Sequence, residues 1–444
     1  MTNLSEFENR SNSYQISDVS YPRSNSLFYN LFKPINKGAV RSNVFLVIST
    51  TLGAAFFLLP CLAKEIGIVL IFCLLLLSFA TNNIMSHLLF LGFQETNATS
   101  YQNYVSIIFG KKYKYLCDLI LLLHLTSSYV STSIFSYYYF ESSIENLFYY
   151  KQQVTMSSKF TYSFFGGLLI LICVVNLINR IEFLKKISRL TLVLISYLII
   201  VFCAKMPKYF KYYSAQPYEV YYLFNFSWKV LPVWGVCLYI LVNQYSLFTV
   251  FHNFYSITKR RFTKMYLYAS YILVFVYTLM ICIGFLSSPY FNCSENFCLR
   301  PQIDEGIEYT IQIGKLVFSF SLMISISVKS YFMLSFLNSL FGFNKADFDD
   351  TSKKKICKYV VNFIYLFIMT MMGYGLRKKI VLIVSLTGSI MGMFQIIIFP
   401  LSGFLKLNRK KRLFSGLVSN GITVYAFLIL VLTLMTISYN IYNT

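Results

Sequence analysis

The stretch Val44–Leu77, VFLVISTTLGAAFFLLPCLAKEIGIVLIFCLLLL, decides the fold of this chain. It begins as a membrane span, but Thr50, Thr51 and Gly53 interrupt it halfway, and Pro60 follows. Polar, breakable backbone within a bilayer is tolerated only where it faces protein or a water-filled cavity. Transporters build substrate sites from such discontinuous helices. The stretch therefore predicts a membrane protein and, within that class, favours a secondary transporter.

The composition agrees with a chain that lies mostly in lipid. Of its 444 residues, 57% are hydrophobic and 13% charged, whereas a soluble protein carries about 25% charged residues. Residues 1–38 are polar, rich in Ser and Asn, and lack the apolar core of a cleavable signal peptide. We predict a disordered cytosolic tail over residues 1–38, because nothing there could bury a hydrophobic face. Residues 39–440 then form the transmembrane transporter domain.

The net charge of +22 is spread in a way that argues against a nucleic-acid partner. Basic residues sit in short loops between apolar runs, which is the positive-inside pattern of membrane proteins. This pattern predicts an integral membrane protein that is surrounded by the lipid bilayer and has a cytosolic N-terminus. The clusters are Lys111-Lys112, Lys185-Lys186, Lys259-Arg260-Arg261, Lys353–Lys355 and Lys410-Lys411-Arg412.

Apolar runs long enough to cross a bilayer recur along the chain, and a span needs about 20 residues. An interrupted first span among eleven suggests two inverted repeats of five helices plus one extra helix, so the sixth span should also be broken. That span, Lys229–Phe254, contains Pro232 and Gly235, residues that kink a helix or lower the cost of unwinding it. The eleven predicted spans are roughly 44–63, 66–90, 115–140, 160–179, 188–205, 230–251, 265–287, 312–340, 357–375, 380–404 and 416–438.

Three segments carry a resemblance to a known family. They are TTLGAAFFLLPCLAKEIGIVL (50–70), ITKRRFTKMYLYASYILVFVYTLMICIGFLSS (257–288) and VSLTGSIMGMFQIIIFPLSGFLKL (384–407). In order and spacing they resemble the amino acid/auxin permease family, which includes system A and N neutral amino acid transporters and vacuolar amino acid exporters. The similarity covers about residues 40–440. It implies an all-α LeuT-like fold, an amino acid substrate and no enzymatic activity.

The chain departs from the family where sodium-coupled relatives bind their ion. Ala55 replaces the second glycine of the first-helix break, and Ser49 stands where an Asn is usual. In the eighth span we align Ser325 and Ser327, followed by Lys329, with the family's Thr pairs and Pro. The family thus implies amino acid transport, while these changes favour proton coupling or exchange over sodium coupling.

The substrate site that the resemblance implies combines the two breaks. Backbone N–H groups at the start of a half-helix form a positive dipole end that suits a substrate carboxylate. We predict the sixth-span break at Trp234-Gly235-Val236, whose carbonyls would receive the substrate ammonium. The aromatic neighbourhood of Trp234 and Tyr239 hints at neutral or aromatic substrates. The candidate residues are Thr50, Thr51, Gly53 and Ala54 in the first span, with Trp234, Gly235, Val236 and Tyr239 in the sixth.

Two of these residues have a purely structural alternative. Gly53 could simply allow close helix packing, although packing alone does not explain the adjacent Thr50 and Thr51. The Thr51 hydroxyl could bond back to its own helix.

Lys329 is the sharpest single anomaly, because an ionisable residue within a span is a functional hypothesis by default. Its ammonium could stand in for a sodium ion near Ser325 and Ser327 on the same helix, and could titrate during proton-coupled or uncoupled exchange. The alternative is that the side chain snorkels to the cytosolic interface at the end of a long helix. The sequence leaves both interpretations open.

The cysteines and histidines form no metal site, and no Gly-rich phosphate loop appears, so we expect no metal, no cofactor and no ATP drive. Cys293 and Cys298 share a polar loop and could form a disulfide, and Asn292 begins a glycosylation sequon there. The other eight cysteines, scattered in or beside apolar runs, are expected to behave as small hydrophobes.

The leading hypothesis is a secondary active amino acid transporter that works by alternating access. The main alternative is an amino acid sensor or signalling scaffold that kept the transporter fold without turnover. A membrane-embedded enzyme comes third, because His124, in the third span, has no evident catalytic partner. The sequence does not separate the plasma membrane from the membrane of a lysosome-like vacuole.

Overall fold

The first predicted span is broken, as the sequence indicated. In the computed structural model, helix α3 (Val40–Thr51) ends where the Thr pair ends. The chain then continues as a 3₁₀ helix, η1 (Ala54–Leu58), and a short helix, α4 (Leu59–Ile66). The predicted interruption is therefore confirmed.

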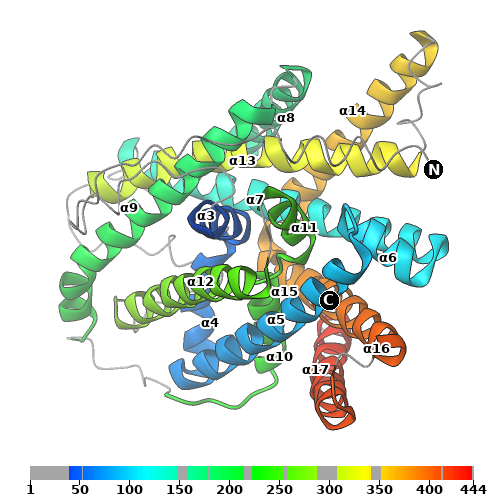
Figure 1. Ribbon diagram of the computed structural model, residues 1–444. Coiled ribbons are helices and arrows are strands. Elements are labelled where there is room, and N and C mark those ends of the chain that lie inside the picture. The colour runs from blue at the N-terminus through cyan, green and yellow to red at the C-terminus, as the bar shows by residue number, and fades with distance from the viewer. Residues whose placement is uncertain are drawn as a thin grey trace, which may run out of the picture. The chain divides into compact units, whose positions relative to one another are not determined.

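The structure describes residues 40–52, 54–148, 158–178, 181–214, 223–254, 258–287, 308–341, 352–411 and 414–442. Every regular element within these ranges is a helix (Figure 1). Eight of the described helices are long and apolar enough to cross a membrane. The all-α membrane fold is thus confirmed, whereas the predicted number of eleven spans is not established by these eight. The predicted tail, residues 1–38, lies outside the described part of the chain.

Most of the other helices coincide with predicted spans, and α6 is a short helix that was not predicted from the sequence. Their bounds are α5 (Ile68–Thr96), α6 (Tyr101–Phe109), α7 (Lys111–Phe148), α8 (Ser158–Ile178), α9 (Ile181–Ser214), α12 (Lys259–Ser287), α13 (Tyr309–Leu340), α14 (Ser352–Gly375) and α17 (Gly416–Tyr442).

A sharp turn at Gly67 separates α4 from α5. Gly67 has a φ of 90° and an added Cβ would lie 2.6 Å from the Leu223 carbonyl oxygen, so only glycine fits. The segment before α10 runs along this turn, where the Asn225 N–H donates to the Ile66 carbonyl at 2.8 Å and the Val69 N–H to that of Leu223 at 3.0 Å.

The sixth predicted span is also broken, but later than the sequence suggested. Helix α10 (Val230–Tyr239) runs without interruption through Trp234–Val236, and α11 (Gln244–Asn253) begins after a non-helical stretch. The prediction of a break at Trp234–Val236 was therefore wrong. Pro232 lies in the first turn of α10, where a backbone N–H has no intrahelical acceptor in any case, so it does not break the helix.

Gly235 and Gly388 instead bring α10 close to the tenth predicted span. That span comprises η4 (Arg377–Lys379), α15 (Ile380–Met391), the π-helical η5 (Gly392–Ile398) and α16 (Phe399–Lys411). A Cβ on Gly235 would overlap the Ser385 carbonyl oxygen, and a Cβ on Gly388 would overlap the Gly235 carbonyl oxygen. Small residues are what lets two membrane helices approach this closely.

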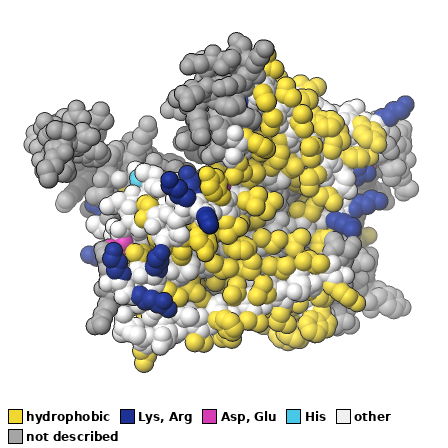
Figure 2. All heavy atoms as spheres, turned by 90° about the vertical axis from the view of Figure 1, so that its right-hand side faces the viewer, with side chains coloured by type: hydrophobic (Ala, Val, Ile, Leu, Met, Phe, Trp, Pro, Cys, Tyr) yellow, Lys and Arg dark blue, Asp and Glu magenta, His cyan; other side chains and the backbone are white. Residues whose placement is uncertain are grey.

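The outer surface of the described helices is apolar. Figure 2 shows one face dominated by hydrophobic side chains, with Lys and Arg gathered towards its two edges. Exposed hydrophobic residues are found on six different helices and include Leu76, Ile170, Ile200, Phe275, Phe363 and Leu428. Apolar surface on this scale is typical of contact with lipid rather than water.

Candidate functional site

A hydrogen bond joins the two interruptions. Asn243, the last residue before α11, donates from its amide Nδ2 to the Thr51 hydroxyl at the end of α3, at 3.3 Å. The Thr51 hydroxyl in turn donates to the Val47 carbonyl oxygen at 2.7 Å. The structural alternative for Thr51 is thus observed, and the same oxygen also contacts the sixth-span break.

A buried polar network holds the sixth-span break in place. The Tyr266 hydroxyl, from α12, accepts from Asn82 Nδ2 at 2.7 Å and lies 2.8 Å from the Ser86 hydroxyl, both on α5. It lies 3.2 Å from Asn243 Oδ1, to which it donates. The Gln244 side chain donates to Asn82 Oδ1 and accepts from the Asn243 N–H. A buried network whose members are all paired specifies one geometry, because each unpaired group would be costly.

The backbone of the break itself offers acceptors. The Leu241 N–H donates to the Leu238 carbonyl at 3.1 Å and the Val242 N–H to that of Tyr239 at 3.4 Å, so the end of α10 tightens. Within the described residues, the carbonyl oxygens of Leu241 and Val242 accept no hydrogen bond. Such groups at a half-helix C-terminus attract a cation.

Helix α7 presents a row of hydroxyl groups to this region. The Ser131 and Tyr239 hydroxyls lie 3.1 Å apart, and those of Ser127 and Thr387 lie 2.5 Å apart. The His124 ring lies 6.1 Å from the ring of Tyr239. This row was not predicted from the sequence, yet the run Leu125–Ser133, LTSSYVSTS, placed in the middle of an apolar span, was the available signal.

Lys329 of α13 points towards the same row. Its Nζ donates to Thr132 Oγ1 at 2.6 Å and to the Ser128 carbonyl at 3.4 Å. Ser128 lies about 21 Å along the helix axis from both Lys114 and Ser142, which are near the two ends of α7. The ammonium therefore contacts the middle of α7 and is not turned towards a helix end, contrary to the snorkelling interpretation.

The remaining predicted coupling residues are less informative. Ser327 is buried and bonds to the Met323 carbonyl of its own helix at 3.3 Å, while Ser325 is half-buried. The structure shows no hydrogen bond from either hydroxyl to Lys329. The side chains of Ser49, Thr50 and Ala54, and the whole of Gly53, lie outside the described part.

Two further residues of the predicted substrate site, Trp234 and Val236, pack within the helix bundle. The Trp234 indole N–H donates to Thr433 Oγ1 of α17 at 3.3 Å. Val236 is fully buried. Tyr239 is the member of the predicted sixth-span set whose side chain reaches the polar row of α7.

The predicted modification sites are Cys293, Cys298 and Asn292, and all three lie outside the described residues. Cys61, in α4, is disulfide-bonded, so treating it as one more small hydrophobe was wrong. Seven other cysteines are free, including Cys117 and Cys237 in the core. Among the residues that the structure describes, no group of three His, Cys, Asp or Glu side chains is placed to hold a metal ion.

Beside the first-span break lies a cluster of four aromatic rings, here called the Phe57 cluster. The Phe57 ring, from η1, lies 5.7 Å from Tyr139 of α7, 6.3 Å from Phe202 of α9 and 5.8 Å from Phe318 of α13. All four side chains are buried. The cluster joins the segment that follows the break to three other helices.

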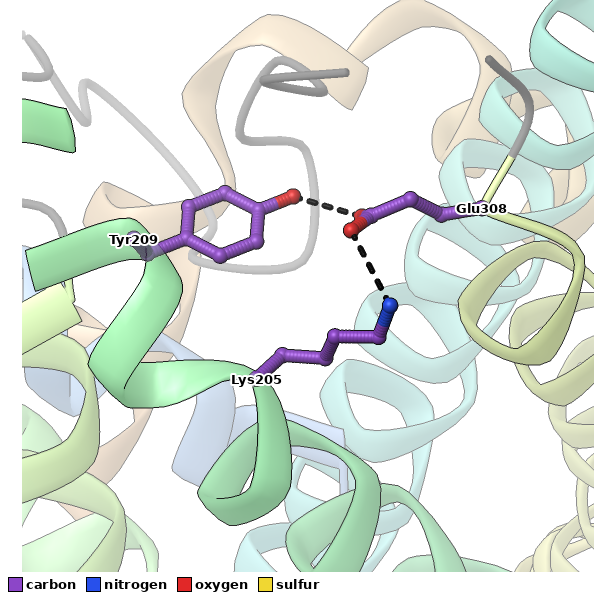
Figure 3. A network of polar contacts seen from close by, with 3 residues as sticks. All are labelled: Lys205, Tyr209 and Glu308. Carbon is purple, nitrogen blue, oxygen red and sulfur yellow. Dashed lines mark hydrogen bonds and ion pairs between the residues drawn. The ribbon is translucent and has the colours of Figure 1, made fainter. Parts of the chain in front are cut away.

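A buried carboxylate connects the end of α9 to the start of α13 (Figure 3). Glu308 accepts a hydrogen bond from the Tyr209 hydroxyl at 2.6 Å and lies 3.6 Å from Lys205 Nζ. The Glu308 side chain is 2% exposed and that of Lys205 is 34% exposed. A buried carboxylate is tolerated where it is paired in this way.

The chain matches the family described as "Transmembrane amino acid transporter protein" over residues 36–443. It belongs to this family. The resemblance to amino acid/auxin permeases is thus confirmed over most of the chain.

A curated relative adds to this result. "Putative amino acid transporter AAT1" of Plasmodium berghei (strain Anka) is 26% identical over 259 residues, which cover 58% of this chain and 40% of the relative. The chain thus matches less than half the length of that relative.

Two crystal structures of a manganese transporter from Eremococcus coleocola are similar in fold. One is a complex with an aromatic bis-isothiourea compound, and the other is of a mutant in which one histidine is replaced by alanine. Their TM-scores are 0.51 and 0.50 at 12% identity, covering 96% of this chain and 90% of each other chain. At this identity the likeness establishes a transporter fold of the LeuT-like type and nothing about cargo.

Proposed function

We propose that this protein is a secondary active transporter that moves amino acids across a membrane by alternating access. The observation that carries the proposal is the Asn243–Thr51 hydrogen bond, which brings the ends of two interrupted helices together. Interrupted helices that meet in this way place unpaired backbone groups of both signs around one position. An amino acid carries the two complementary charges.

The substrate lies between the two breaks. N–H groups at the start of η1, directly after the interruption, receive its carboxylate, since helix N-termini attract anions. The carbonyls of Leu241 and Val242, at the end of α10, receive its ammonium. Tyr239, on the same half-helix, lines the side-chain pocket, which suits neutral or aromatic amino acids.

Transport is coupled to protons or to exchange rather than to sodium. Lys329 places a fixed ammonium against Thr132 of α7, whose neighbour Ser131 contacts Tyr239 at the end of α10. A fixed cation supplies the positive charge that a bound sodium ion would otherwise bring. Ser49, Ser325 and Ser327, which replace the residues typical of sodium-coupled relatives, fit this interpretation.

Reconstitution of the purified protein in liposomes tests the proposal. Uptake of radiolabelled amino acids is measured with an inward sodium gradient, with an inward proton gradient, or with unlabelled amino acid inside. We expect flux in the second or third condition and no stimulation by sodium. Absence of flux for all twenty amino acids in all three conditions would overturn the transporter function, and binding without flux would instead favour a sensor.

A further inference from the structure

Among the described residues, no carboxylate pairs with the ammonium of Lys329. Its hydrogen-bond partners, the Thr132 hydroxyl and the Ser128 carbonyl, are both neutral oxygens. The ion pairs among the described residues are Lys205–Glu308 and Lys229–Glu65, and neither involves Lys329. A charged side chain in the membrane is expensive unless an opposite charge accompanies it.

The neighbouring side chains add no negative charge to the region. The His124 ring, also on α7, lies 6.1 Å from the ring of Tyr239. Tyr239 of α10 and Ser131 of α7 add neutral hydroxyls. No described carboxylate faces the ammonium from α7, α10 or α13 itself.

The ammonium is also close to the proposed substrate position. Thr132, which holds it, is the neighbour in sequence of Ser131, and the Ser131 hydroxyl contacts Tyr239 at 3.1 Å. Tyr239 is the last residue of α10, directly before the sixth-span break. The anion that Lys329 lacks can therefore come from a ligand held at the break.

We infer that Lys329 is the counter-charge for a carboxylate of the transported amino acid, an inference that rests on the proposed function. An amino acid that enters the site brings the negative charge, and the ammonium then pairs with it at low dielectric. The chain itself supplies the cation, so carboxylate binding needs no sodium ion. Thr132 acts as a positioning residue, because its hydroxyl orients the ammonium without carrying charge.

Competition in proteoliposomes tests this inference. Vesicles are loaded with a mixture of the twenty radiolabelled amino acids, and efflux is driven by external leucine, phenylalanine or glutamate. Leucinamide, phenylalaninamide and glutamine, which each lack one carboxylate, serve as matched competitors. For wild type we expect each α-amide to be at least about tenfold weaker than its parent acid, as for a lost hydrogen bond to a charged group.

Variants at two positions separate charge from geometry. In Lys329→Met the ratio between acid and amide should fall at least about fivefold, with the remainder due to the backbone N–H groups, whereas Lys329→Arg should retain it. Thr132→Val should weaken both competitors but keep their ratio, since the charge remains. A loss confined to the glutamate–glutamine pair would still support the inference and would assign the carboxylate to the substrate side chain.

The outcomes are distinguishable from failure of the proposed function. Undiminished discrimination between acid and amide in Lys329→Met would overturn the inference while leaving transport intact. Absence of any flux by wild type, whether by exchange or under a proton gradient, would overturn the proposed function. For a variant that folds but does not transport, thermal stabilisation of the purified protein by each ligand gives the same ratio, because ligands that bind the folded state raise its melting temperature.

Discussion

The carbonyl oxygen of Gly235 in α10 lies against the Cα of Gly388 in α15, so closely that a Cβ on Gly388 would overlap it. The same added Cβ would lie 2.7 Å from the Cβ of Tyr239. The glycine thus fixes how near the tenth predicted span comes to the half-helix that ends at the break.

Gly388→Ala should therefore destabilise the protein by about 1–3 kcal/mol, the usual cost of overpacking, and should reduce transport. The melting temperature of the purified protein in detergent and exchange in liposomes report these effects. Gly421→Ala is the matched control, because a Cβ at this α17 position meets nothing within 4 Å. Equal melting temperatures for wild type and Gly388→Ala would show that the two helices are not held this close.

Tyr266→Phe should impair transport by loosening the sixth-span break. The change removes the hydroxyl that Asn82, Ser86 and Asn243 share, and each buried group left unpaired costs about 1–3 kcal/mol. Tyr271→Phe, on the same helix but 60% exposed, should leave stability and exchange unchanged. Wild-type exchange rates in Tyr266→Phe would show that transport does not depend on the network.

The two tryptophans should report the membrane boundary. Trp228 is 68% exposed beside an apolar hollow of about 490 Å³ lined also by Leu231, Met435 and Tyr439, whereas Trp234 is fully buried. Each variant keeps one tryptophan, and bromine on the acyl chains of the bilayer quenches a tryptophan that it contacts. Trp234→Phe, which keeps the exposed Trp228, should therefore lose most of its fluorescence. Trp228→Phe should be quenched little. Stronger quenching of Trp228→Phe than of Trp234→Phe would place this end of α10 outside the bilayer.

A double-mutant cycle should measure the Tyr209–Glu308 contact. Tyr209→Phe and Glu308→Gln should show a coupling of about 1.5–3 kcal/mol in unfolding free energy, since the hydrogen bond is to a charged group. Tyr197→Phe is the control, because its hydroxyl bonds to the Thr310 carbonyl at 3.0 Å, and it should add independently to Glu308→Gln. Additive effects for Tyr209 as well would show that the contact contributes nothing.

The first break could be predicted because its cause is local: two threonines and a glycine lie in an apolar run. The sixth could be predicted only approximately, since the non-helical residues are Ile240, Leu241, Val242 and Asn243, and the first three are ordinary span residues. Their conformation depends on distant groups, among them the Tyr277 hydroxyl, which donates to the Ile240 carbonyl at 2.9 Å. Local sequence carries no signal for such contacts.

The site was predicted unevenly for the same reason. Lys329 stood out as a charge in an apolar helix, but its direction towards Thr132 depends on how α7 and α13 pack. Trp234 was placed in the substrate pocket on chemical grounds, whereas its indole N–H donates to Thr433 of α17, a contact that local sequence does not indicate.

The Phe57 cluster has a thermodynamic consequence for alternating access. If η1 moves away from α7, α9 and α13, the Phe57 ring and the rings of Tyr139, Phe202 and Phe318 become hydrated. Hydration of apolar surface carries a positive heat capacity, and its cost falls on cooling. The balance between the closed and open states should therefore vary with temperature along a curve, with cooling shifting the population towards the open state.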